Sequence, residues 1–95
     1  MAQVVFLDFS LFEEEPLGRL KIQLETELAP RTSENFRQLC TGEFHIDRAP
    51  VGYKGCLVRL RTTTTGKLYL ESGDFDGRGG TSIYGDGIVI DNLSA

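Results

Sequence analysis

The chain has 95 residues, of which 40% are hydrophobic and 25% are charged. This length allows one domain with a modest core, and the composition is that of an ordinary globular chain. The formal net charge of −4 argues against direct binding to nucleic acid, because nucleic-acid binders carry a basic surplus.

Three features of the sequence bear on the compartment in which the protein works. The N-terminal segment MAQVVFLDF lacks a basic stretch, and Asp8 interrupts its apolar run, so it does not resemble a secretory signal. No window holds the roughly 18 apolar residues of a membrane span. Cys40 and Cys56 are too few for a disulfide framework. We therefore expect an intracellular protein, cytoplasmic or nuclear, with reduced thiols and no membrane contact.

The first part of the chain predicts two strands followed by a helix. Residues 4–9 are rich in apolar and aromatic side chains, and residues 18–24 alternate between apolar and polar ones, which is typical of strands. The acidic segment 13–18 contains Pro and Gly, and we expect it to connect the two strands as an antiparallel pair. An apolar stripe predicts a helix over residues 30–41, with Gly42 as its left-handed cap.

The second part of the chain predicts short strands between loops. Residues 43–54 are expected to form a loop. Alternating side chains predict strands over residues 56–61 and 68–71, joined by the connection 62–67. The glycine-rich segment 77–85 favours a flexible turn, and a short apolar run follows at residues 88–90.

Five stretches of this sequence, in this order and spacing, resemble the cyclophilin family. They are EPLGR at 15–19, APRTSENFRQLCTGE at 29–43, GYKG at 52–55, GDF at 73–75 and SIYG at 82–85. Within the family, CTGEF at 40–44 followed by PVGYK at 50–54 is most similar to the cyclophilin H branch, the spliceosomal one. The resemblance extends over almost the whole chain.

The resemblance implies a fold and an activity. The family's domain is a closed antiparallel barrel of eight strands capped by two helices, and it catalyses cis/trans isomerisation of peptide bonds before proline. This chain corresponds to little more than half of such a domain. The expected fold is therefore mainly β: residues 1–95 form the N-terminal part of a cyclophilin-like antiparallel β-barrel with one capping helix, and the chain does not complete the barrel.

The same resemblance implies the site residues. Arg59 matches the family's catalytic arginine, and Leu68, Tyr69 and Glu71 take the positions of its substrate-binding phenylalanine, methionine and glutamine. The interval from Arg59 to Glu71 is four residues longer than the family's. Arg61 lies on the same strand face as Arg59 and competes with it if the register slips by two residues.

Glu71 is the departure that matters most for chemistry. A glutamine donates a hydrogen bond to a substrate carbonyl, whereas an ionised carboxylate only accepts. We also expect the Glu71 carboxylate to pair with Arg59 and occupy its donors.

No cofactor or metal is expected. His45 with Cys40, Cys56 and Asp47 lacks the ligand spacing of a zinc site. The pair Gly66-Lys67 lacks the rest of a phosphate-binding loop.

Three functional hypotheses follow from the sequence. The first is a catalytically degraded cyclophilin that acts as a binding or structural component of a larger assembly. The second is an active peptidyl-prolyl isomerase that assists protein folding, and the third is a fragment without independent function. The expected partners are proline-containing segments and a protein that covers the open barrel edge.

Overall fold

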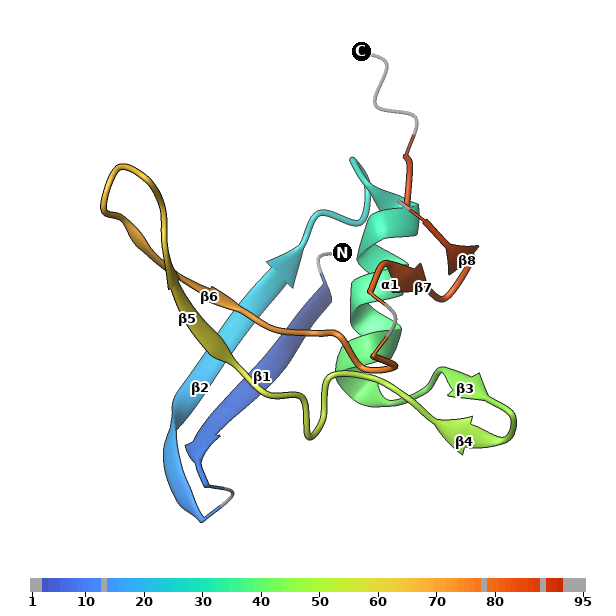
Figure 1. Ribbon diagram of the computed structural model, residues 1–95. Helices are drawn as coiled ribbons and strands as arrows, with labels where there is room; N and C mark the ends of the chain where they lie inside the picture. The colour runs from blue at the N-terminus through green and yellow to red at the C-terminus, as the bar shows by residue number, and fades with distance from the viewer. Residues whose placement is uncertain (1–2, 13, 78, 88, 92–95) are drawn as a thin grey trace.

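The described residues of the chain form one helix and four two-stranded antiparallel sheets (Figure 1). The computed structural model describes residues 3–12, 14–77, 79–87 and 89–91. The elements are β1 (Gln3–Leu11), β2 (Glu15–Leu24), α1 (Pro30–Thr41), β3 (His45–Ile46), β4 (Ala49–Pro50), β5 (Arg59–Thr62), β6 (Leu68–Glu71), β7 (Thr81–Ser82) and β8 (Gly85–Asp86). The predicted mainly-β fold with one helix and an unclosed barrel is confirmed. The predicted apolar run at 88–90 lies partly outside the described residues.

The pair β1–β2 is the longest sheet, and its two faces differ in character. Val5 lies opposite Ile22 on the face that meets α1, and this face contributes the buried side chains of Val5 and Leu24. On the other face, Arg19 donates to both carboxylate oxygens of Asp8, at 2.7 and 3.2 Å. This outer face is exposed. Burial of only one side of the sheet therefore explains why apolar and polar side chains alternate along residues 18–24.

Both strands of this pair are longer than predicted. The strand β2 begins at Glu15 rather than at residue 18, so that Pro16 belongs to it and lies opposite Ser10. Proline is tolerated there because β2 is an edge strand. A shift of register between Phe9 and Ser10 accommodates the extra residue.

The helix α1 has the predicted bounds, and its end is capped as expected. Gly42 adopts the left-handed conformation, with φ 81°, and its N–H donates to the Gln38 carbonyl. Arg37 forms ion pairs with two glutamates: its Nε lies 2.8 Å from Oε1 of Glu34, and its Nη1 lies 2.5 Å from Oε2 of Glu43. The helix supplies Leu39, whose side chain is the most deeply buried of the described residues.

The predicted loop 43–54 contains a small hairpin, β3–β4. Its two turn residues, Asp47 and Arg48, have φ values of 51° and 69°. Two consecutive positive φ values are typical of a type I′ turn, which normally carries Asn-Gly or Asp-Gly. Because Asp-Arg lacks that signature, the hairpin could not be recognised in the sequence.

The segment that follows β6 is docked on α1 rather than free, which corrects the predicted flexible turn at 77–85. The Ile83 amide donates to the Asn35 side chain at 2.8 Å, and the Tyr84 hydroxyl donates to the Arg31 carbonyl. Further along, the Asp91 carboxylate accepts from the amides of Arg31 and Thr32 at the start of the helix. Burial opposes ionisation of Asp91, but hydrogen bonds with Thr32 and Arg31 lower its pKa below the ordinary value.

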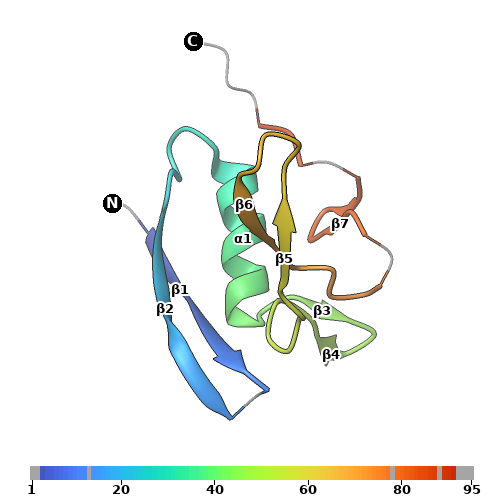
Figure 2. The same ribbon diagram turned by 60° about the vertical axis from the view of Figure 1, so that its left-hand side comes forward.

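The fold leaves much apolar surface uncovered. Only Val5, Leu24 and Leu39 are buried hydrophobic residues in the described part of the chain. The radius of gyration is 14.6 Å, whereas a compact domain of this length has about 12 Å. Figure 2 shows the pairs β1–β2 and β5–β6 as separate ribbons, with α1 between them in this view. No helix in the described residues is long and apolar enough to cross a membrane.

The Glu34 network predicts a pH-dependent stability. Hydrogen bonds from Arg37 and Gln38 lower the pKa of Glu34 from its ordinary 4.5 to about 2. The ionised group therefore adds stability above pH 4.5, which is lost as the pH falls toward about 2. In chemical unfolding, Glu34→Gln should lower the free energy of unfolding at pH 7 by less than about 1 kcal/mol, because the pair is partly exposed. The difference should vanish near pH 2, and the exposed control Glu27→Gln should show no such effect; a difference independent of pH would contradict the assignment.

Candidate functional site

The hairpin β5–β6 carries the predicted site, and its register decides which side chains share a face. Arg59 lies opposite Glu71, and Arg61 lies opposite Tyr69. Directly opposed residues of an antiparallel pair project to the same side. Arg59, Arg61, Tyr69 and Glu71 therefore share one face of the hairpin.

Leu68 lies on the other face of the hairpin. It is opposite Thr62, one step from the pair Leu60–Leu70. The structure thus brings three of the four predicted site residues together and separates Leu68 from them.

The expected pairing of Glu71 with Arg59 is not what the structure shows. The Glu71 carboxylate lies 3.3 Å from Nε of Arg61. Arg61 reaches Glu71 diagonally across the hairpin, and both side chains are about half exposed, at 45% and 51%. Within the described residues, the Arg59 side chain has no hydrogen bond or ion pair. Its guanidinium donors are therefore available to a ligand.

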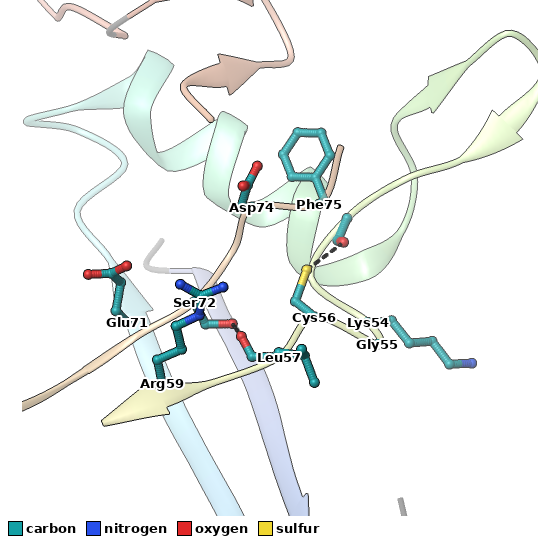
Figure 3. Close-up of a pocket in the computed structure, with 10 residues that line it drawn as sticks. Lys54, Gly55, Cys56, Leu57, Arg59, Glu71, Ser72, Asp74 and Phe75 are labelled. Atoms are coloured by element: carbon teal, nitrogen blue, oxygen red, sulfur yellow. Dashed lines mark hydrogen bonds between the residues drawn. The ribbon is translucent and has the colours of Figure 1, made fainter. Parts of the chain in front are cut away.

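Arg59 lines a pocket at the base of the hairpin, with a volume of about 400 Å³ (Figure 3). The lining residues come from two segments that flank the hairpin, together with Arg59 and Glu71: Gly52, Lys54, Gly55, Cys56, Leu57, Arg59, Glu71, Ser72, Asp74 and Phe75. Lys54 and Arg59 are balanced in formal charge by Glu71 and Asp74. The pocket is open to solvent and offers both donors and acceptors, which suits a polypeptide backbone better than an anion.

Tyr53 fixes the pocket against the helix. Its amide donates to the Leu39 carbonyl at 2.9 Å, and its ring lies 5.5 Å from that of Phe36. A Cβ built on Gly73 would lie 3.0 Å from the same ring. A Cβ on Gly52 would collide with the Leu39 carbonyl. Glycine at residue 52 allows this segment to approach the helix closely, and glycine at residue 73 allows its segment to approach the Tyr53 ring.

The strand predicted over residues 56–61 begins only at Arg59. The amide of Cys56 donates to the Tyr53 carbonyl in a turn, and the Leu57 carbonyl accepts from the Ser72 hydroxyl at 2.8 Å. These bonds replace ladder pairing at the base of the hairpin. Ser72 is therefore a site residue that sequence reasoning missed, since a serine beside a glycine has no distinctive pattern.

The threonine-rich connection between the strands forms an ordered turn. The Thr63 amide donates to the Lys67 carbonyl at 2.8 Å, and the Gly66 amide donates to the Thr63 carbonyl at 3.0 Å. The Thr63 hydroxyl also accepts from the Lys67 amide. This turn closes the hairpin in the register that sets Arg59 opposite Glu71.

Other reactive groups near the pocket do not form a second chemical centre. Burial raises the pKa of the Cys56 thiol, so the thiol stays protonated at neutral pH. Across residues 3–12, 14–77, 79–87 and 89–91, no three His, Cys, Asp or Glu side chains lie close enough to hold a metal ion.

Comparison with known proteins assigns the family. Residues 7–92 match the family described as cyclophilin type peptidyl-prolyl cis-trans isomerase/CLD. The chain belongs to this family.

Individual relatives agree with this assignment. The chain is 45% identical over 85 residues to peptidyl-prolyl cis-trans isomerase H of Rhizopus delemar, covering 86% of this chain and 46% of the relative. It is 45% identical over 82 residues to isomerase H of Mycosarcoma maydis, covering 83% of this chain and 51% of that protein. Peptidyl-prolyl cis-trans isomerase 11 of Caenorhabditis elegans is 41% identical over 93 residues, which cover 95% of this chain and 49% of the relative.

Two of these relatives are isomerases H, which confirms the predicted branch. The chain spans about half the length of the curated relatives it matches.

The contact between Gly52 and the helix predicts a position that tolerates no side chain. Gly52→Ala should lower the free energy of unfolding by about 1–3 kcal/mol, because its methyl group meets backbone that cannot move freely. Urea unfolding measures this loss. The control is Gly66→Ala, where φ is +88° but nothing lies within 4 Å of the added Cβ. The only expected cost there is that of a positive φ for a residue with a side chain, about 1 kcal/mol. A loss at Gly52 no larger than that at Gly66 would contradict the close contact.

Proposed function

We propose that this chain is a catalytically degraded cyclophilin that binds proline-containing segments at the Arg59 pocket, inside the cell, as a component of a larger assembly. The observation that carries the proposal is the arrangement of the hairpin face. Arg59 has no partner among the described residues, while Glu71, in the glutamine position, is an acceptor held by Arg61.

The physical task of the family explains what its catalytic arginine does. The barrier to isomerisation comes from amide resonance and amounts to about 18–20 kcal/mol. When the bond twists, resonance is lost and the proline nitrogen becomes a better hydrogen-bond acceptor. A fixed guanidinium stabilises that state more than either planar state. Arg59 lines an open pocket, and we expect its donors to bind a polypeptide backbone there even without rate enhancement.

Catalysis needs more than the arginine, and the rest of this face does not provide it. A donor at the glutamine position would hold the substrate carbonyl while the bond rotates, whereas the Glu71 carboxylate repels that oxygen. Leu68 lies on the opposite face of the hairpin and does not line the pocket. Binding therefore requires fewer groups than catalysis, and we expect it to survive the changes at Leu68 and Glu71.

An active isomerase is the second candidate. The family assignment and the free donors of Arg59 favour it.

Two assays on the same protein separate these functions. Fluorescence titration with a labelled peptide that contains one Ala-Pro bond measures binding, and a protease-coupled assay measures isomerisation. Arg59→Ala should weaken binding about tenfold or more, because a hydrogen bond to a charged group contributes about 1.5–3 kcal/mol. The protease-coupled rate should equal the uncatalysed one, which takes tens of seconds or longer.

Lys67→Ala is the matched control, because Lys67 is an exposed cation in the turn of the same hairpin and does not line the pocket. It should change binding by less than about twofold. Equal losses for Arg59→Ala and Lys67→Ala would reject the Arg59 pocket. A rate enhancement that Arg59→Ala abolishes would establish the active isomerase instead.

A further inference from the structure

One carboxylate on the hairpin face lies within reach of two arginines. Glu71 is directly opposite Arg59 in the register of β5 and β6. Arg61 is opposite Tyr69, and Glu71 is therefore its diagonal neighbour. Directly opposed side chains of an antiparallel pair start about 4.5–5.5 Å apart and diagonal ones about 7–8 Å apart, a distance that long side chains still bridge. The register thus allows Glu71 to pair with either arginine.

The structure holds only one of these two ion pairs. The Glu71 carboxylate lies 3.3 Å from Nε of Arg61, whereas the Arg59 side chain has no ion pair or hydrogen bond among the described residues. Arg59 and Glu71 both line the pocket, and Arg61 does not. An arginine outside the pocket therefore binds the carboxylate that lies opposite the arginine inside it.

The other charged side chains of the pocket do not take part in this competition. The Asp74 carboxylate accepts a hydrogen bond from the Gly79 amide at 2.9 Å, within its own loop. Lys54 extends away from Glu71, on the far side of the pocket in the view of Figure 3. Glu71 is therefore the carboxylate that the hairpin places against the donors of Arg59.

The two possible ion pairs differ little in free energy, because both join exposed side chains. Arg61 and Glu71 are 45% and 51% exposed, and an ion pair of that kind shifts an equilibrium by about fivefold or less. Without Arg61, the Glu71 carboxylate pairs with Arg59 in part of the molecules. The apparent affinity for a ligand of Arg59 then falls with the fraction of molecules whose Arg59 is free.

We propose that Arg61 is a positioning residue for the pocket: by pairing with Glu71, it keeps the Arg59 guanidinium free to bind a prolyl segment. This inference rests on the proposed function, because its ligand is the peptide that Arg59 binds. It gives the diagonal ion pair a role in ligand affinity, through a residue that does not itself touch the ligand.

The test depends on removing the two partners of this ion pair separately. Arg61→Ala and Glu71→Gln both abolish the pair, but only Arg61→Ala leaves a carboxylate free to occupy Arg59. In the fluorescence titration with the Ala-Pro peptide, Arg61→Ala should weaken binding about two- to fivefold. Glu71→Gln should bind at least as tightly as the wild type, because it removes the ionised competitor. Weaker binding by Glu71→Gln would mean that the ion pair only stiffens the hairpin, and would overturn the proposal.

A double variant separates positioning from direct contact with the peptide. Arg61→Ala/Glu71→Gln should bind as Glu71→Gln does, because no carboxylate is left to occupy Arg59. The same loss with and without Glu71 would show that Arg61 contacts the peptide itself, and would reject the positioning role. The matched control is Lys67→Ala, which removes one cation from the turn of the same hairpin. A loss as large as that of Arg61→Ala would show an effect of charge alone and would also reject it.

NMR of the arginine side chains without ligand separates this inference from the proposed function. The Nε–Hε signal of Arg59 should shift in Arg61→Ala, and in the double variant it should match that of Glu71→Gln. This pattern without Arg59-dependent peptide binding would overturn only the proposed function. Arg59-dependent binding, with an affinity and an Arg59 signal that Arg61→Ala leaves unchanged, would overturn only the positioning role.

Discussion

The contact of Tyr53 with helix α1 is the interaction on which the site depends. The Tyr53 amide binds the Leu39 carbonyl, and the ring lies between Phe36 and the backbone of Gly73. One residue thereby ties the helix to the segments before β5 and after β6. Burial raises the pKa of the Tyr53 hydroxyl, so the ring remains neutral at this junction. The neighbours of Tyr53, Gly52 and Lys54, line the same pocket as Arg59.

A second constraint is the shortage of buried apolar area. The described residues bury only three hydrophobic side chains, while the hairpin that carries Arg59 shows leucines on its other face. Arg59 and these leucines thus belong to opposite sides of the same two strands.

Local signals made the helix, its glycine cap and the long strand pair predictable, because each depends on residues close together in the chain. The other features depend on long-range or unusual geometry. Glu71 pairs with Arg61 diagonally across the hairpin rather than with Arg59 directly opposite. The alternation of side chains predicts which residues share a face, but not which of them pair. Docking of the glycine-rich segment needs Asn35, 48 residues away from Ile83. The β3–β4 turn places Arg48 at a positive φ, against the ordinary preference of arginine.

The central claim is that Arg59 binds a prolyl segment without accelerating its isomerisation. Exchange spectroscopy by NMR, on a peptide with one Ala-Pro bond mixed with the chain, tests both parts in one sample. The account predicts that resonances of β5 and β6 shift on titration, while cis and trans peptide signals show no exchange peaks on the second timescale. Exchange peaks that disappear with Arg59→Ala, or shifts that Arg59→Ala leaves unchanged, would contradict it.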